Sequence, residues 1–173
     1  MSRSVKLLLL LAVGLALAVG GTWAYARHLP NTHEYTQTIT IAHNPPDTWN
    51  LLRHIQEYPR WRQGLRTVIP TDSSEDGLTK WTEVWDRQKL YVHIISAKIP
   101  DSLYLELEAE RHTYRKEWTW ATEIVPPDSI RISLKERQWV QPPFLRLYQH
   151  FFPNQNDEVA AALRDVAQGF SRP

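Results

Sequence analysis

The stretch Pro142 to Phe170, PPFLRLYQHFFPNQNDEVAAALRDVAQGF, decides the fold of this chain. Its second half carries apolar residues at i, i+3, i+4, i+7 and i+11, the spacing of one face of an α-helix: Val159, Ala162, Leu163, Val166 and Phe170. Gly169 is a suitable residue to end this helix. The stretch therefore predicts a long closing helix whose apolar face needs a partner surface.

Segments with the alternation of a β-strand precede the helix and supply that surface. The clearest is Leu103 to Glu110, in which leucines alternate with tyrosine and glutamate. Similar alternation covers 33–42, 78–86, 90–96, 115–125 and 130–137, and Thr71 to Gly77 has the composition of a turn. Strands that follow one another through short turns predict an antiparallel sheet with one solvated face. The sequence therefore predicts a two-layer α+β domain in which the closing helix covers the other face.

The N-terminal stretch Leu7 to Ala26 has the length and composition of a membrane span. Its twenty residues, LLLLLAVGLALAVGGTWAYA, carry no charge and are enough for the roughly 30 Å of hydrocarbon in a bilayer. Arg3 and Lys6 precede the stretch, and Trp23 and Tyr25 lie near its far end, where aromatic residues favour the membrane interface. The positive-inside rule then places residues 1–6 in the cytoplasm and the domain outside it.

The same stretch has an alternative interpretation as a cleaved signal peptide, because Ala24-Tyr25-Ala26 has the small-x-small form of a cleavage site. The apolar run is longer than a signal core, which favours an uncleaved anchor over a secreted protein. In either case, we expect residues 27–32 to be a linker and residues 33–173 to form one exported domain.

Composition excludes some classes of function. The chain has 20 basic and 19 acidic residues, and this balance does not favour a nucleic-acid partner. It has no cysteine, and its seven histidines show no metal-ligand spacing, so we expect no metal. It also has no phosphate-binding glycine motif, and we expect no cofactor. Eight tryptophans and seven tyrosines indicate either a deep core or an aromatic-lined pocket.

The order of these elements, together with three local strings, resembles the SRPBCC or START-like superfamily, most closely its polyketide cyclase/dehydrase-like branch. The strings are ITIAHNPPDTWNLLRHIQEYPRWRQGLRTV (39–68), KEWTWATEIVPPDSIRISLKE (116–136) and PFLRLYQHFF (143–152). The resemblance implies a helix-grip fold, in which a curved antiparallel sheet wraps around the long C-terminal helix. It also implies a cavity between sheet and helix for a hydrophobic small molecule or lipid. The N-terminal anchor departs from the basic family domain, and so does Pro153, which interrupts the closing helix.

Glu83, Glu136 and His93 are the candidate groups for chemistry. Each glutamate falls on an otherwise apolar strand face, where an unpaired carboxylate is expensive to bury. The two glutamates are therefore either proton-transfer groups in one cavity or are matched by solvent or an arginine such as Arg62 or Arg137. His93 lies on the opposite face from its apolar neighbours, which favours a surface or hydrogen-bonded histidine.

Several further side chains are expected to line the cavity if one exists. The complete ligand-binding set is Trp61, Trp81, Glu83, Trp85, Trp118, Trp120, Glu136, Tyr148 and Phe152. The tryptophans either line the cavity or fill it. Tyr148 and Phe152, with Leu145 and Phe151, have three interpretations: core packing, a pocket mouth, or contact with a membrane. Core packing is the one that we favour.

These observations predict a membrane-anchored, non-catalytic module that binds a hydrophobic small molecule or lipid, with Pro153 controlling access to the cavity. One alternative is a cyclase- or dehydrase-type enzyme that uses Glu83, Glu136 or His93 for proton transfer. Another is a protein-interaction domain that has no functional cavity and exposes an apolar patch instead.

Overall fold

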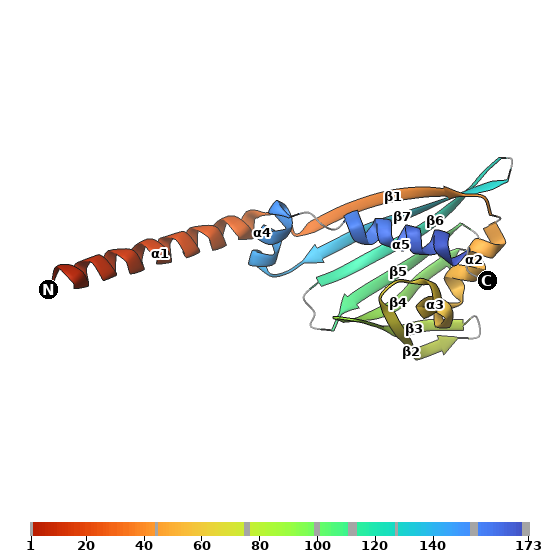
Figure 1. The fold of residues 1–173 in the computed structure, drawn as a ribbon, viewed down its shortest axis with the longest axis horizontal. Helices are drawn as coiled ribbons and strands as arrows, with labels where there is room; N and C mark the ends of the chain where they lie inside the picture. The colour runs from red at the N-terminus through yellow and green to blue at the C-terminus, as the bar shows by residue number, and fades with distance from the viewer. Residues whose placement is uncertain are drawn as a thin grey trace. The chain divides into compact units, whose positions relative to one another are not determined.

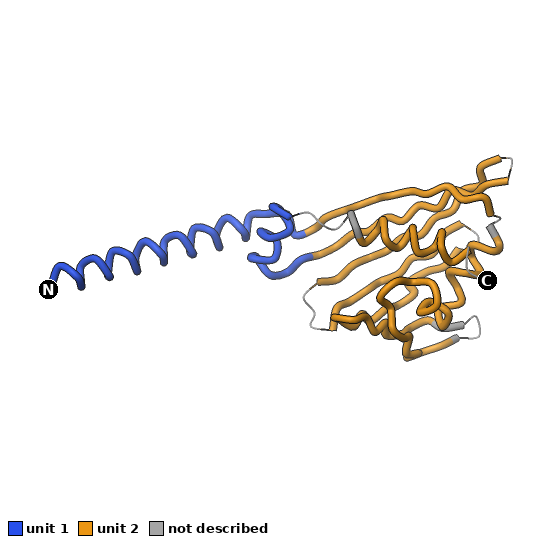
Figure 2. Tube along the Cα trace, viewed as in Figure 1, with its two compact units in different colours: residues 1–31, 140–153 blue, residues 32–139, 154–173 orange. Residues whose placement is uncertain are grey.

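The computed structural model describes residues 2–43, 45–74, 77–98, 101–110, 114–126, 128–152 and 156–170. Pro153, to which we assigned the gate, lies outside the described residues. The chain divides into two compact units, shown in Figure 2. The first unit is Met1–Asn31 with Val140–Pro153, and the second is Thr32–Trp139 with Asn154–Pro173.

The first unit contains two helices, α1 (Arg3–His28) and α4 (Pro143–Phe151). Helix α1 is apolar and long enough to cross a membrane, with a mean hydropathy of 2.2 in a window of which no residue is buried. It continues through Arg27 and His28, the first residues of the expected linker. Helix α4 packs against α1.

Our expectation of core packing for the aromatic segment was wrong, because α4 contains no buried residue. The rings of Phe144, Tyr148, Phe151 and Phe152 are all exposed. Their spacing does describe one face of a helix, but no other part of the described chain covers that face.

The second unit is built on a seven-stranded sheet in the order β1-β7-β6-β5-β4-β3-β2. The strands are β1 (Thr32–Ile41), β2 (Leu65–Ser74), β3 (Gly77–Trp85), β4 (Lys89–Lys98), β5 (Ser102–Ala109), β6 (Tyr114–Val125) and β7 (Ser129–Val140). Strands β1 and β7 pair antiparallel, as do the successive pairs from β2 to β6. The predicted antiparallel sheet is confirmed, and its first two strands lie at opposite edges.

The alternation read from the sequence sets which side chains face the core. Strand β5 alternates half-buried and buried residues along its whole length, and β7 buries every second residue from Ile130 to Val140. The turn expected over Thr71 to Gly77 was placed too early, because β2 continues to Ser74 through an irregular register with β3. Pro70 is tolerated within β2 because this strand is at the edge of the sheet.

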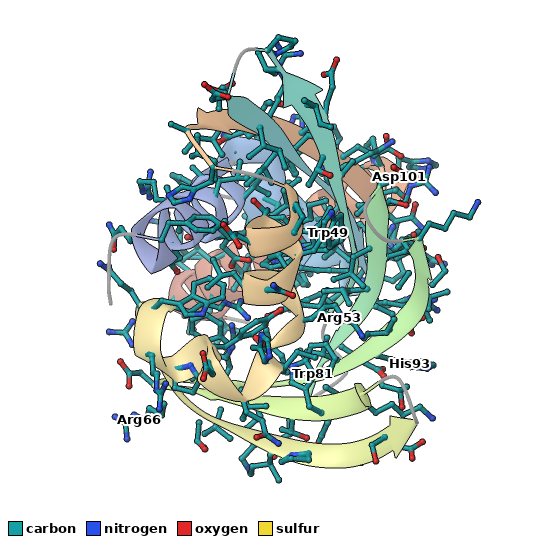
Figure 3. The ribbon with its side chains drawn as sticks, turned by 90° about the vertical axis from the view of Figure 1, so that its right-hand side faces the viewer. Trp49, Arg53, Arg66, Trp81, His93 and Asp101 are labelled. Carbon is teal, nitrogen blue, oxygen red and sulfur yellow. The ribbon has the colours of Figure 1, made fainter. Side chains whose placement is uncertain are left out.

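Four helical segments cover the inner face of the sheet: α2 (Pro45–Arg53), a 3-10 turn (Ile55–Glu57), α3 (Tyr58–Trp61) and α5 (Asn156–Gly169). Figure 1 shows α2, α3 and α5 on one side of the strands, and Figure 3 shows the sheet bending around them with Trp49 and Trp81 on that side. The closing helix is confirmed, since its apolar stripe is buried in the core: Val159, Ala162, Leu163 and Val166.

The end of α5 is held close to the helices that precede β2. A Cβ atom at Gly169 would lie 2.9 Å from Cδ2 of Leu51 and 3.3 Å from Cγ of Trp61, so a larger residue here would require the Leu51 side chain to move. The turn between α3 and β2 uses Gly64, whose φ of 81° lies in the left-handed region. Helix α3 contacts both the edge strand β2 and the closing helix α5.

Candidate functional site

Two glutamates point from the sheet into the core, as the alternation predicted. Glu83 on β3 is 1% exposed, and Glu136 on β7 is 0% exposed. Each one shares its strand face with large apolar side chains. An isolated carboxylate in such surroundings would be protonated or strongly destabilising, so the partners of each one decide what it does.

Glu83 is held by three donors. The Arg62 Nη1 atom lies 2.5 Å from Glu83 Oε1, and both side chains are buried. The indole nitrogen of Trp81 donates to Oε1 at 3.3 Å, and that of Trp85 donates to Oε2 at 3.1 Å. The Arg62 guanidinium also lies 4.9 Å from the centre of the Trp85 ring. Both oxygens of Glu83 therefore have partners, and the arginine is shared between the carboxylate and an aromatic face.

This network ties helix α3 to the sheet. Arg62 is the residue that ends α3, and its backbone nitrogen still bonds to the carbonyl of Tyr58 at 2.8 Å. The next backbone nitrogen, that of Gln63, donates to Asp165 Oδ2 on α5 at 3.2 Å. Removing either partner of a buried ion pair destabilises the fold, because the remaining charge is then buried without a counter-charge. Glu83 is thus placed as a structural clamp.

Glu136 has a different and less complete environment. Its Oε2 atom accepts a hydrogen bond from the indole nitrogen of Trp118 at 2.6 Å and lies 3.4 Å from the Lys116 Nζ atom. Its Oε1 atom is buried and has no hydrogen-bond partner among the described residues. Burial raises the pKa of Glu136, although Lys116 and the Trp118 hydrogen bond act in the opposite direction. The protonated form is thus favoured more than in water.

Lys116 joins Glu136 to the closing helix. Its side chain is buried, and its Nζ atom donates to Glu158 Oε2 on α5, whose own side chain is half exposed. Burial alone would lower the pKa of Lys116, but the nearby carboxylates of Glu136 and Glu158 outweigh it and raise that pKa. Lys116 is therefore a buried ammonium that stays charged between two acids.

A pocket of about 340 Å³ lies between α5 and the sheet, next to Lys116. Its apolar walls come from Trp85, Leu90, Leu107, Trp118 and Ala162. Its polar lining includes both members of the Lys116–Glu158 pair. Arg62, at the end of α3, and Arg164 and Asp165, on α5, complete that lining. The pocket thus combines aromatic and aliphatic surface with charged groups that already have partners in the Lys116–Glu158 and Arg62–Glu83 pairs.

Deeper between sheet and helices, the space is filled by side chains. The void there measures about 10 Å³, which is room for roughly one water molecule. It is bordered by tryptophans 61, 118 and 120 and by Glu83. The aromatic residues therefore play both expected roles, because most of them fill the core and two of them also border the open pocket.

The residues expected to bind a ligand are consequently separated. Trp85 and Trp118 line the 340 Å³ pocket, and Trp118 also borders the small void together with Trp61, Trp120 and Glu83. Trp81 and Glu136 are buried in the core behind them. Tyr148 on α4 and Phe152 just after it belong to the other unit. His93 pairs in register with Lys80 and Glu106 on the outer side of the sheet, so the three candidate proton-transfer groups do not converge.

Sequence reasoning named Arg62 and Arg137 as possible partners of the two glutamates without assigning them, and the structure pairs Arg62 with Glu83. It missed Lys116 as the partner of Glu136, since Arg137 turns outward to Glu34 instead, at 2.6 Å. The signal was present in the alternation, because position 116 has the same parity as the buried tryptophans 118 and 120 on β6. Among the described residues, no group of three His, Cys, Asp or Glu side chains is arranged to hold a metal ion.

Comparisons with known proteins identify the fold. No protein-family model and no curated protein matches the sequence. Among solved structures, a START superfamily protein from Mycobacterium smegmatis matches with a TM-score of 0.63 at 12% identity, covering 80% of this chain and 94% of that one. Truncated norcoclaurine synthase from Thalictrum flavum matches with a TM-score of 0.62 at 12% identity, covering 79% and 92% of the two chains.

A third solved structure, the Zhui aromatase/cyclase from a Streptomyces species, matches with a TM-score of 0.62 at 11% identity, covering 82% and 95% of the two chains. Together, these likenesses and the observed topology identify the fold: the domain has the START-like helix-grip fold, and the chain adds an N-terminal apolar helix. Identities this low show the fold alone, and proteins with this fold include enzymes.

Proposed function

We propose that this domain binds a hydrophobic small molecule, or a single chain of a lipid, in the pocket beneath α5 and that it does not catalyse a reaction. The observation that carries the proposal is the 340 Å³ space between α5 and the sheet, walled by Trp85, Leu90, Leu107 and Trp118. Ligand pockets are typically concave and mostly apolar, with a few polar groups that fix orientation.

The dimensions of the pocket limit the ligand. Its volume is at the lower end of the roughly 300–1,000 Å³ that is usual for small-molecule sites. Since the deeper void holds only about 10 Å³, the ligand stays beside α5 and does not enter the centre of the sheet. One ring system or one acyl chain suits this space better than a two-chain lipid.

We also propose that α1 is an uncleaved membrane anchor, with residues 1–6 in the cytoplasm and the domain outside it. The span carries no charge between Leu7 and Ala26, and Arg3 and Lys6 precede it. Ala26 at the end of the span is fully buried and α4 packs on α1, which supports a helix that is retained in the mature protein. Mass spectrometry of the mature N-terminus tests this, and a protein that begins at Arg27 would refute the anchor.

Two phenylalanine substitutions on α5 test the pocket. Ala161 lines it, whereas its neighbour Ala160, equally half-buried, does not. Ala161→Phe should weaken binding of the neutral dye aminoanthracene by about tenfold or more, because the new ring occupies the space that the dye needs. Ala160→Phe is the matched control and should bind like the unsubstituted full-length chain in the same detergent. Equal binding by both variants would show that the dye does not use this pocket.

One observation favours the enzymatic alternative, namely that Lys116 lines the pocket 3.4 Å from a buried glutamate. A lysine with a raised pKa keeps its proton near neutral pH, so it can donate a hydrogen bond or stabilise negative charge but is unsuited to serve as a base or to give up its proton. Native mass spectrometry of co-purified ligand separates the two functions. A binding module carries the same ligand mass with and without Lys116→Met, whereas an enzyme accumulates substrate in the variant.

A further inference from the structure

Helix α4 presents a band of aromatic side chains that nothing in the described chain covers. Phe144, Tyr148 and Phe151 recur at i, i+4 and i+7, and Phe152 continues the band beyond the helix end. Each ring is more than half exposed, with Phe151 the most open at 62%. The Tyr148 and Phe152 rings lie 5.2 Å apart, so these two rings adjoin within the band. Soluble proteins rarely expose several large apolar side chains together unless the patch binds a protein, a membrane or a ligand.

The position of this band within its own unit indicates what covers it. Helix α4 packs against α1. Figure 1 shows it beside the C-terminal end of α1, the end that carries the exposed rings of Trp23 and Tyr25. The guanidinium of Arg27 stacks over the Trp23 ring at 4.6 Å, so the charged end of the apolar helix follows immediately. Tryptophan, tyrosine and a flanking arginine at one level of a span are typical of the membrane–water interface.

The start of α4 is fixed at this level by its own hydrogen bonds. Arg146 donates from Nε to the carbonyl of Val140 at 2.8 Å and from Nη2 to the carbonyl of Gln141 at 2.9 Å. In addition, the backbone nitrogen of Val140 donates to the carbonyl of Asn31, just beyond α1, at 2.9 Å. Hydrogen bonds therefore hold the start of α4 next to the C-terminal end of α1.

We propose that α4 is an interfacial helix whose face of Phe144, Tyr148, Phe151 and Phe152 lies at the boundary between lipid headgroups and acyl chains. An amphipathic helix with aromatic residues on one side binds this boundary by burying that side. The inference rests on the proposed membrane span of α1, because the span sets the depth at which α4 meets the bilayer. We thus infer that the aromatic face of α4 contacts the lipid bilayer and not another protein.

Fluorescent labels on single cysteines test the depth of each part, since the natural chain has no cysteine. The full chain is reconstituted in phosphatidylcholine vesicles containing some phosphatidylglycerol and is labelled with a nitrobenzoxadiazole dye at one position at a time. The positions are Leu15 in the span, Phe151 on α4 and Ile124 on β6, which are exposed to a similar extent at 68%, 62% and 69%. A label at His150 keeps all four aromatic rings and serves as a second reporter for α4.

The proposal predicts three different quenching patterns. Nitroxide placed deep on the acyl chains should quench the Leu15 label, nitroxide near the headgroups should quench the Phe151 and His150 labels, and only aqueous iodide should quench the Ile124 label. If iodide quenches both α4 labels as strongly as Ile124 while Leu15 stays protected, the interfacial helix is refuted and the span remains.

Two other results also overturn the proposal. Access of iodide to the Leu15 label would refute the span and the interfacial helix together. Protection of both α4 labels from iodide and from every nitroxide would show that a second copy of the chain covers α4. A variant with serine at positions 144, 151 and 152 should make the His150 label accessible to iodide and leave the Leu15 label protected.

Discussion

The two glutamates on the inner face of the sheet differ in how completely they are paired. Glu83 on β3 has an arginine and two indole donors, and both of its oxygens are used. Glu136 on β7 has one indole and a lysine on the same oxygen, and its other oxygen has no partner in the described chain. The same residue type, equally buried, therefore serves as a clamp in one place and as part of an incomplete polar group near a pocket in the other.

The two networks also differ in which residues they bring to the pocket. The Glu83 network connects α3 to β3 and borders a space that holds about one water molecule. The Glu136 network reaches through Lys116 to Glu158, and these two residues line the open pocket. Ligand recognition is therefore expected beside Lys116 and Glu158, and the Glu83 network should matter for stability and for holding Arg62 and Trp85 in the wall of the same pocket.

Removing the Glu83 carboxylate should have the largest effect. Glu83→Ala leaves the Arg62 guanidinium buried without its anion, and such a loss typically lowers the free energy of unfolding by about 3–5 kcal/mol. Urea denaturation of the full-length chain in detergent, followed by tryptophan fluorescence, measures this change. The double variant Arg62→Met with Glu83→Leu should recover most of it, because an apolar pair needs no matching charge. Equal losses in the single and double variants would contradict the role as an ion-pair clamp.

Neutralising Glu136 should have a smaller effect, with a characteristic dependence on pH. Glu136→Gln keeps an acceptor for Trp118 and leaves Glu158 to pair with Lys116, so we expect a loss of about 1–3 kcal/mol. Burial raises the folded-state pKa of Glu136 above its ordinary value of 4.5. The stabilisation from this group is thus complete below pH 4.5 and is lost as pH rises through the raised pKa.

The stability difference between the natural chain and Glu136→Gln should therefore shrink as pH increases from 4.5, measured by urea denaturation at each pH. Glu34→Gln is a control of opposite sign, because hydrogen bonds from Lys135 and Arg137 lower the pKa of Glu34. Its contribution should be lost as pH falls. A difference for Glu136→Gln that grows with pH would refute the assigned direction of the pKa shift.

The smallest effect should come from a surface pair of the same sheet. Arg131 and Glu123 lie 2.7 Å apart with both side chains in solvent. Glu123→Gln should change the free energy of unfolding by no more than about 1 kcal/mol, because water screens the pair. The same urea titration measures it, and added salt should reduce even this small change. A loss as large as that of Glu83→Ala would mean that burial does not explain the difference between the pairs.

Much of the fold followed from patterns that are local in the chain. The alternation in β5 and β7 and the helical spacing of Val159, Ala162, Leu163 and Val166 identified the inner faces, because strands and helices bring every second or every third to fourth residue to one side. The same rule placed both glutamates inside. It would also have placed Lys116 inside, had its parity with Trp118 been applied.

The sequence by itself determined that this chain has an antiparallel sheet, a closing helix and an apolar N-terminal helix, since periodicity and length are local properties; the number of strands, seven, came from the structure. Only the tertiary structure decided that Arg62 pairs with Glu83, that Lys116 joins Glu136 to Glu158, and that a 340 Å³ pocket remains open beside α5. It also separated α4 from the core that the closing stretch was expected to complete. The physical reason is that pairing and cavity volume depend on distances between segments far apart in the chain, and no local pattern contains those distances.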